Sequence, residues 1–243
     1  MRRILIPGDT HRTFSHLKGY NDEPTVMIIL GDAGINYCID QRDADFKRSL
    51  GRKFNNITFL CVRGNHEERP ENLDMVIKDI TTQEYTGTFY VEPEFPNILY
   101  FIDGCYYNIG GHSIFVMGGA YSVDKMWRLI NGWSWFENEQ LNDDERAHIT
   151  DCVEDYLADG NHLDLVLTHT APIGFEPTQM FLDCIDQDYV ESLCDKWIAE
   201  VDNGKIEIEN YEINLWETTT KTQIWHKERS FAESLICWVD PAC

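Results

Sequence analysis

The sequence predicts an α/β fold in which two packed β-sheets are flanked by outer helices within one domain. Short apolar runs recur along the chain, and each ends in polar or glycine-rich residues. Continuous apolarity over about five residues is typical of strands buried on both faces. Helical patterns lie between several of these runs, and the middle of the chain is rich in strand-like segments separated by turn residues.

The core strands are predicted from five apolar runs. They are RILIP, TVMIIL, ITFLCV, SIFVMGG and LDLVL, which begin at residues 3, 25, 57, 113 and 163. Polar residues follow most of these runs directly, so each strand is expected to end at a turn or loop.

Two helices are predicted from apolar side chains spaced four residues apart. Residues 40–54 carry one such stripe, and Ile149, Val153 and Leu157 form another. Gly160 follows the second stripe and is expected to cap that helix at its C-terminus.

The middle of the chain differs because residues 86–119 alternate strand-like segments with turns and leave no room for helices. We expect these segments to form an antiparallel or mixed second sheet. The tail also alternates like a strand over residues 205–216. The sequence shows no linker or repeat, so we expect residues 1–243 to form a single domain, whose part from about residue 205 is atypical.

The chain is strongly acidic, with 42 Asp and Glu residues against 20 Lys and Arg residues and a net charge of −22. Such a surface repels polyphosphates and anionic lipids, so we expect neither nonspecific nucleic-acid binding nor membrane binding.

No apolar run approaches the roughly 20 residues of a membrane span, and the start does not have the pattern of a signal peptide. Eight cysteines without a CxxC pair are expected to be reduced. These features predict a cytoplasmic protein of unspecified oligomeric state.

Four of the five core runs end in side chains that can bind metal. These are Asp9 and His11, then Asp32, then Asn65 and His66, and finally His169. Residues at the carboxyl ends of strands converge on one crevice in open α/β sheets. Oxygen ligands mixed with imidazole, without thiolates, suit Mn, Fe, Zn or a similar divalent ion. The pattern therefore predicts a metal site.

Four motifs in this order resemble the calcineurin-like metallophosphoesterases: GDTH at 8–11, LGDAG at 30–34, RGNHE at 63–67 and THTAP at 168–172. The resemblance implies a single domain built as a four-layer sandwich, with two central mixed sheets flanked by helices. It also implies a cofactor of two divalent ions. In that pattern Asp9 and His11 bind the first ion and Asp32 bridges both. Asn65 and His169 bind the second ion.

The resemblance further implies a reaction, the hydrolysis of a phosphomonoester or phosphodiester by a metal-bridging hydroxide, without a covalent enzyme intermediate. His66 matches the family's general acid, while no residue is assigned to substrate binding. The expected partner is thus a phosphoester substrate.

The family's terminal Gly-His-x-His motif is missing from this sequence. His226 is the nearest histidine in the tail, and it is either one replacement ligand or an ordinary packed or surface residue. The alternative hypothesis is therefore a catalytically impaired member that binds metal or a phosphorylated ligand without efficient turnover.

Three arginines beside the motifs, Arg12, Arg63 and Arg69, are open to two interpretations. Each is either a phosphate contact or an ordinary residue that pairs with carboxylates or solvent. An aromatic group is equally open, as either the wall of a substrate pocket or the anchor of a long loop, and its members are Trp127, Trp133, Trp135 and Phe136.

Overall fold

The computed structural model describes residues 3–122 and 124–170. The strand-like tail predicted at residues 205–216 and the histidine at position 226 lie outside the described residues. The end of the fourth motif, residues 171–172, also lies outside them.

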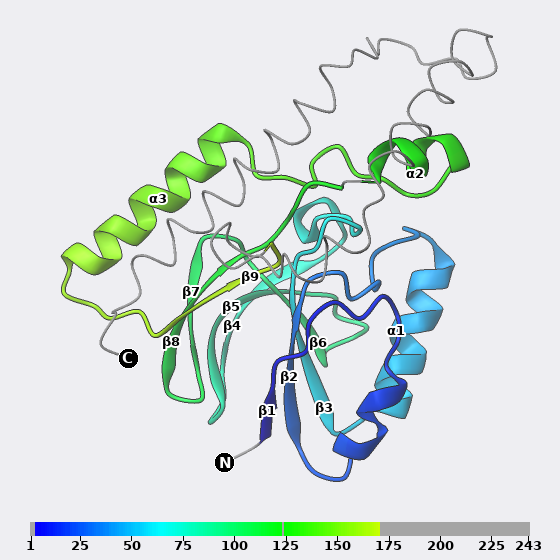
Figure 1. Ribbon diagram of the computed structural model, residues 1–243. Coiled ribbons are helices and arrows are strands. Elements are labelled where there is room, and N and C mark those ends of the chain that lie inside the picture. The colour runs from blue at the N-terminus through cyan, green and yellow to red at the C-terminus, as the bar shows by residue number, and fades with distance from the viewer. Residues whose placement is uncertain (1–2, 123, 171–243) are drawn as a thin grey trace, which may run out of the picture.

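Nine strands and five helices make up the described part of the chain (Figure 1). The strands are β1 (Arg3–Leu5), β2 (Thr25–Leu30), β3 (Ile57–Val62), β4 (Val76–Thr81), β5 (Tyr85–Val91), β6 (Ile98–Phe101), β7 (Cys105–Ile109), β8 (His112–Met117) and β9 (Leu165–Thr168). The α-helices are α1 (Gln41–Lys53), α2 (Lys125–Asn131) and α3 (Asp143–Ala158), and the 3-10 helices are η1 (Ser15–Tyr20) and η2 (Pro70–Asn72).

The strands form one curled mixed sheet in the order β1-β2-β3-β6-β5-β7-β8-β9, with β4 paired to β5 beside this path. Strands β1, β2, β3 and β6 run parallel, whereas the pairs from β6 through β5 and β7 to β8 are antiparallel. Strand β9 returns parallel to β8. The mixed α/β class is confirmed, and the middle segments are the antiparallel section of this sheet. The predicted four-layer arrangement, with two central sheets flanked by helices, stays a prediction.

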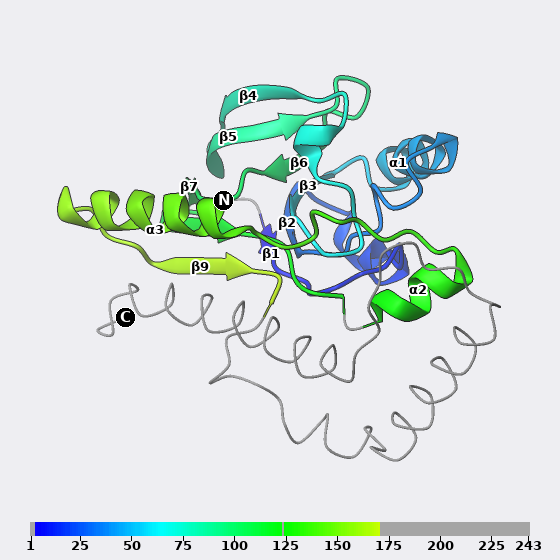
Figure 2. The same cartoon turned by 90° about the horizontal axis from the view of Figure 1, so that it is seen from above.

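Burial on both faces of the sheet explains the continuous apolar runs of β2 and β3, whereas β1 and β9 are only partly buried and differ from the prediction. On β2, Met27 and Ile29 pack in the cluster that includes Leu50 of α1. The alternate residues Val26 and Ile28 belong to a second cluster, to which β5, β7 and β8 also contribute. A third cluster lies under α3. Helices α1 and α3 lie on opposite sides of the molecule in both views (Figures 1 and 2).

Both predicted helices form, and local capping fixes their ends. The side chain of Asp40 accepts the N–H two residues further on, which starts α1. Asn142 and Glu145 form a reciprocal capping box at the start of α3. The cap at the end of α3 is Asp159, and the prediction of Gly160 was wrong by one residue. Gly160 comes next at φ +79°, a left-handed conformation that favours glycine.

Four elements were not predicted: strand β4, helix α2 and the two 3-10 helices η1 and η2. Strand β4 is exposed over most of its length, with Ile77 60% exposed, and therefore lacks the apolar signal of a core strand. Its hydrogen bonds to β5 define it instead. Helix α2 spans seven residues, too few for a repeating apolar stripe to stand out.

Two findings on the described residues concern membrane spans and cysteines. No helix among them is long and apolar enough to cross a membrane. The four cysteines that they include are free, and Cys61 is buried in β3.

We predict that Phe59→Ala lowers the free energy of unfolding by about 3–5 kcal/mol. Phe59 is fully buried in β3 and packs edge-on against Phe14 and Phe54, with ring centroids 5.7 and 6.4 Å away. The substitution leaves a cavity between the sheet and the segments around α1. Urea denaturation measures the change, with Ile77→Ala on exposed β4 as the control. An equal loss in both variants would contradict this placement of the core.

Candidate metal centre

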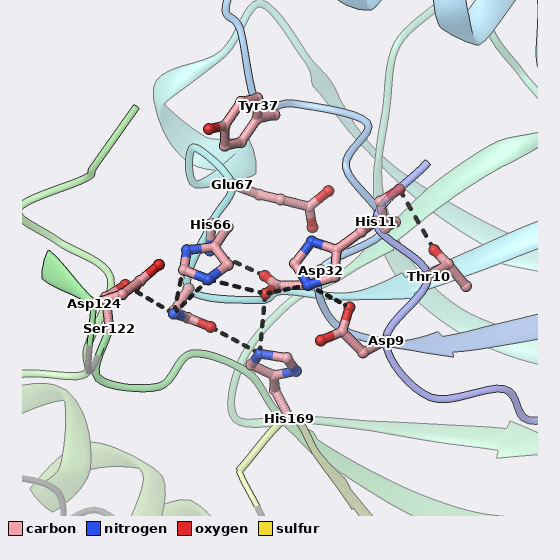
Figure 3. A network of polar contacts seen from close by, with 12 residues as sticks. Asp9, Thr10, His11, Asp32, Tyr37, His66, Glu67, Ser122, Asp124 and His169 are labelled. Atoms are coloured by element: carbon pink, nitrogen blue, oxygen red, sulfur yellow. Dashed lines mark hydrogen bonds and ion pairs between the residues drawn. The ribbon is translucent and has the colours of Figure 1, made fainter. Parts of the chain in front are cut away.

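The loops after β1, β2, β3 and β9 converge at one end of the sheet (Figure 3). Strands β1, β2 and β3 are parallel neighbours, so their carboxyl ends meet at one edge. The curl of the sheet brings the end of β9 to the same place. Nδ1 of His169 lies 2.7 Å from the carbonyl oxygen of Leu30, the last residue of β2. All six predicted site residues lie in these loops.

Asp32 is at the centre of the group and is 2% exposed. Figure 3 shows three imidazoles directed toward it. Its Oδ2 lies 3.8 Å from Nε2 of His11 and 3.7 Å from Nε2 of both His66 and His169. Its Oδ1 accepts the backbone N–H of His66 at 2.9 Å. One carboxylate oxygen is therefore held facing three ring nitrogens from three different loops.

Asp9 and His11 lie on the outer side of Asp32. Nε2 of His11 is 2.9 Å from Oδ1 of Asp9, and one ligand atom from each of the three residues falls within 4.8 Å of the others. Partial burial, and then repulsion by Asp32, raise the pKa of Asp9 above its usual range. A cation among these groups removes the repulsion between the two carboxylates, so the donor set fits a divalent ion.

The orientation of Asn65 follows from a chain of buried hydrogen bonds. Glu139, 3% exposed, accepts the Ser122 hydroxyl proton at 2.5 Å and the Ser122 N–H at 3.0 Å. The Ser122 oxygen in turn accepts Nδ2–H of Asn65 at 2.8 Å. The amide is thereby fixed with Oδ1 directed toward His169, 2.9 Å from its Nε2.

The contact between Asn65 and His169 is suited to a cation. Nδ1 of His169 faces a carbonyl oxygen, which only accepts, so the ring donates there and a neutral ring carries its lone pair on Nε2. Two acceptor atoms then face each other at 2.9 Å. A bound cation satisfies both atoms at once. This pair therefore also fits a metal ion.

His66 lies beside the carboxylate, and its side chain is 14% exposed. Its Nε2 is 2.9 Å from Nη2 of Arg128 in α2. Burial lowers the pKa of the imidazole, Arg128 lowers it further, and Asp32 opposes the change. A polar ring at the edge of a metal centre is suited to exchange a proton with a bound ligand.

The backbone of the site is strained where the candidate ligands meet. Asp32 has φ +46° and His11 has φ +40°, values that non-glycine residues adopt rarely. A side chain at Gly31 would collide with the His169 ring, and one at Gly64 would collide with Asp32. The glycines of two motifs therefore allow the strand-end loops to approach each other closely.

Glu67 supports the loop after β2 from a fully buried position. Its Oε1 accepts the N–H of Ile35 at 2.8 Å. Burial, and then the charge of Asp32, raise the pKa of Glu67 to about 7. The sequence analysis assigned no role to Glu67, Ser122 or Glu139. Glu67 lies inside a quoted motif, which was a usable signal, whereas Ser122 and Glu139 are single polar residues without any pattern around them.

The three arginines beside the motifs are paired with carboxylates, which favours the ordinary interpretation. The Nε of Arg12 also donates to the Gly34 carbonyl at 2.6 Å. The carboxylate pairs are Arg12 with Asp43, Arg63 with Asp103 at 2.8 Å, and Arg69 with Glu145 at 2.5 Å.

The aromatic group does not form one wall. Trp127 and Trp133 are exposed by 42% and 50%. Trp135 and Phe136 instead line a groove of about 790 Å³ that also has four glutamates in its lining. Glutamates repel an anionic ester, so this groove is not suited to a phosphoryl group.

A sequence profile of calcineurin-like phosphoesterases matches residues 2–197, a range that includes all six predicted site residues. No curated protein matches the chain.

We predict that Ser122→Ala weakens the binding of Mn²⁺ or Zn²⁺ by about 10- to 100-fold, the usual effect of losing a group that orients a ligand. The change removes the acceptor that fixes the Asn65 amide. Calorimetric titration of the metal-free protein measures the affinity. Ser113→Ala is the control, because its hydroxyl contacts Tyr156 at the other end of β8. Equal metal affinity in both variants and the wild type would refute the orienting role.

Proposed function

The chain belongs to the calcineurin-like phosphoesterase family, and from this premise we propose that it hydrolyses a phosphomonoester or phosphodiester with two divalent ions. The observation that carries the proposal is the buried Oδ2 of Asp32, which faces the Nε2 atoms of three histidines at 3.7–3.8 Å. A carboxylate oxygen in that position is suited to be shared between two cations.

The described residues offer ligands for each ion. Asp9 and His11 would hold the first, and Asn65 and His169 the second, with Asp32 common to both. Mn, Fe, Zn or a similar ion suits this mixture of oxygen and imidazole donors. When bound, such ions acidify water and neutralise the charge of a phosphoryl group in the transition state.

The protein's own side chains supply orientation and a proton. Asp32 is held by the N–H of His66, which ties the shared ligand to the residue beside it. We assign His66 the role of general acid toward the leaving oxygen. Its neighbour Asn65 supplies a ligand oxygen, and the His66 ring itself lies at the edge of the group.

A second candidate function is a member that binds metal or a phosphorylated ligand with little turnover. The sequence lacks the Gly-His-x-His motif that gives the family further imidazole ligands. The first ion would then have Asp9, His11 and Asp32 as its ligands among the described residues. Metal binding without hydrolysis distinguishes this candidate from an active phosphoesterase.

We predict that Asp32→Asn lowers metal content and phosphoesterase activity together, because the amide has only one oxygen and no charge to share between two ions. Elemental analysis after expression with Mn²⁺ or Zn²⁺ measures the metal content. Assays with chromogenic phosphate monoesters and diesters measure the activity. Asp45→Asn, on the exposed side of α1, is the control. A folded wild-type protein that takes up no metal would refute the proposed function.

We predict that His66→Asn keeps the metal but loses about 10²- to 10⁴-fold in turnover, the typical contribution of general acid catalysis. The loss should be smaller for esters whose leaving group needs no proton. Rates for matched activated and unactivated esters measure the difference. Equal losses on both esters would assign His66 another role.

A further inference from the structure

We propose that Arg128 binds the phosphoryl group of the substrate through the two terminal nitrogens of its guanidinium, an inference that rests on the function proposed above. Arg128 lies in α2, and its side chain is 9% exposed. Its Nη2 is 2.9 Å from Nε2 of His66, and that Nε2 is 3.7 Å from Oδ2 of Asp32. The cation therefore reaches the edge of the metal centre on the side of the proposed general acid.

A carboxylate accepts the Nε–H of Arg128, whereas the partners of its two terminal nitrogens are uncharged and accept weaker hydrogen bonds. Nε is 2.9 Å from the carboxylate of Asp124, one turn earlier in the chain. Nη2 faces the ring nitrogen of His66, while Nη1 lies 3.3 Å from the carbonyl of Ser134 and 3.5 Å from the hydroxyl of Tyr37. None of these terminal partners is a carboxylate. A phosphoryl oxygen carries negative charge and forms a stronger bond with a guanidinium than they do.

The three arginines beside the motifs differ from Arg128 in the groups that face their terminal nitrogens. Arg12, Arg63 and Arg69 each direct a terminal nitrogen at a carboxylate. Of these four arginines, Arg128 is the one whose terminal nitrogens face neutral groups. A protein with a net charge of −22 repels an anionic ester, so an available cation at the centre favours its binding.

The hydrogen bond between Arg128 and His66 also affects the proposed general acid. A guanidinium only donates, so Nε2 of His66 is the acceptor in this contact and has no proton to give through that atom. When a phosphoryl oxygen takes the Nη2 donor, Nε2 of His66 is released and faces the bound ester. The released nitrogen can take up a proton from water, and only then can it serve as the general acid.

The experiment titrates the full-length, metal-loaded protein with inorganic phosphate in a calorimeter. For Arg128→Gln we expect phosphate to bind about 10- to 100-fold more weakly, because a hydrogen bond to a charged group is lost. Arg128→Lys keeps the charge but not the planar fork, so we expect a several-fold loss. The KM for a chromogenic monoester should rise in parallel, while metal content stays at the wild-type level.

The matched control is Arg42→Gln, which removes one positive charge at an exposed site on α1 and should leave phosphate affinity unchanged. Wild-type affinity in a folded Arg128→Gln protein would overturn the inference. If thermal melting shows that this variant does not fold, wild-type affinity in Arg128→Lys would overturn it instead. A wild-type protein that takes up metal and hydrolyses the ester but binds no phosphate would overturn this inference and leave the proposed function standing. Phosphate binding that depends on Arg128 supports the inference even where turnover is undetectable.

Discussion

The hydrogen bond from His169 to the carbonyl of Leu30 links two strands that lie far apart in the order of the curled sheet, and the geometry of the site depends on it. It joins the loop after β9 to the end of β2, although the two residues are far apart in the sequence. It also fixes the imidazole so that a neutral ring directs its lone pair inward. The absence of a side chain at Gly31 makes this approach possible. The fold and the chemistry of the site are thus linked through one contact.

The electrostatics of the centre suit a bound cation. Asp9 and Asp32 repel each other, and two acceptor atoms of Asn65 and His169 face one another at 2.9 Å. Each arrangement is unfavourable alone and favourable around a cation. Positive charge at this point also overcomes the repulsion that a chain with net charge −22 exerts on a phosphoester. The ions that we propose would therefore serve both binding and chemistry.

A second layer of buried polar groups surrounds the candidate ligands and determines the directions of their side chains. Glu139 acts on Asn65 through Ser122, and Glu67 supports the loop that carries Asp32. Buried carboxylates of this kind are tolerated because each accepts hydrogen bonds from the main chain. The positive φ of Asp32 persists for the same reason, since the surrounding contacts hold the loop in place.

The sequence by itself determined the strands that are buried on both faces, the two longer helices and the six polar residues at strand ends. Burial on both faces requires a continuous apolar run, as in β2 and β3, and a polar residue directly after such a run is conspicuous. The family followed from the same motifs, and the profile match confirms it. Only the tertiary structure decided which partners these residues have. Strand β4 exists through its pairing with β5, and Arg128 reaches His66 from a short helix 62 residues further along the chain. Contacts of this kind depend on how distant segments pack, so they cannot be predicted from the local periodicity of the sequence.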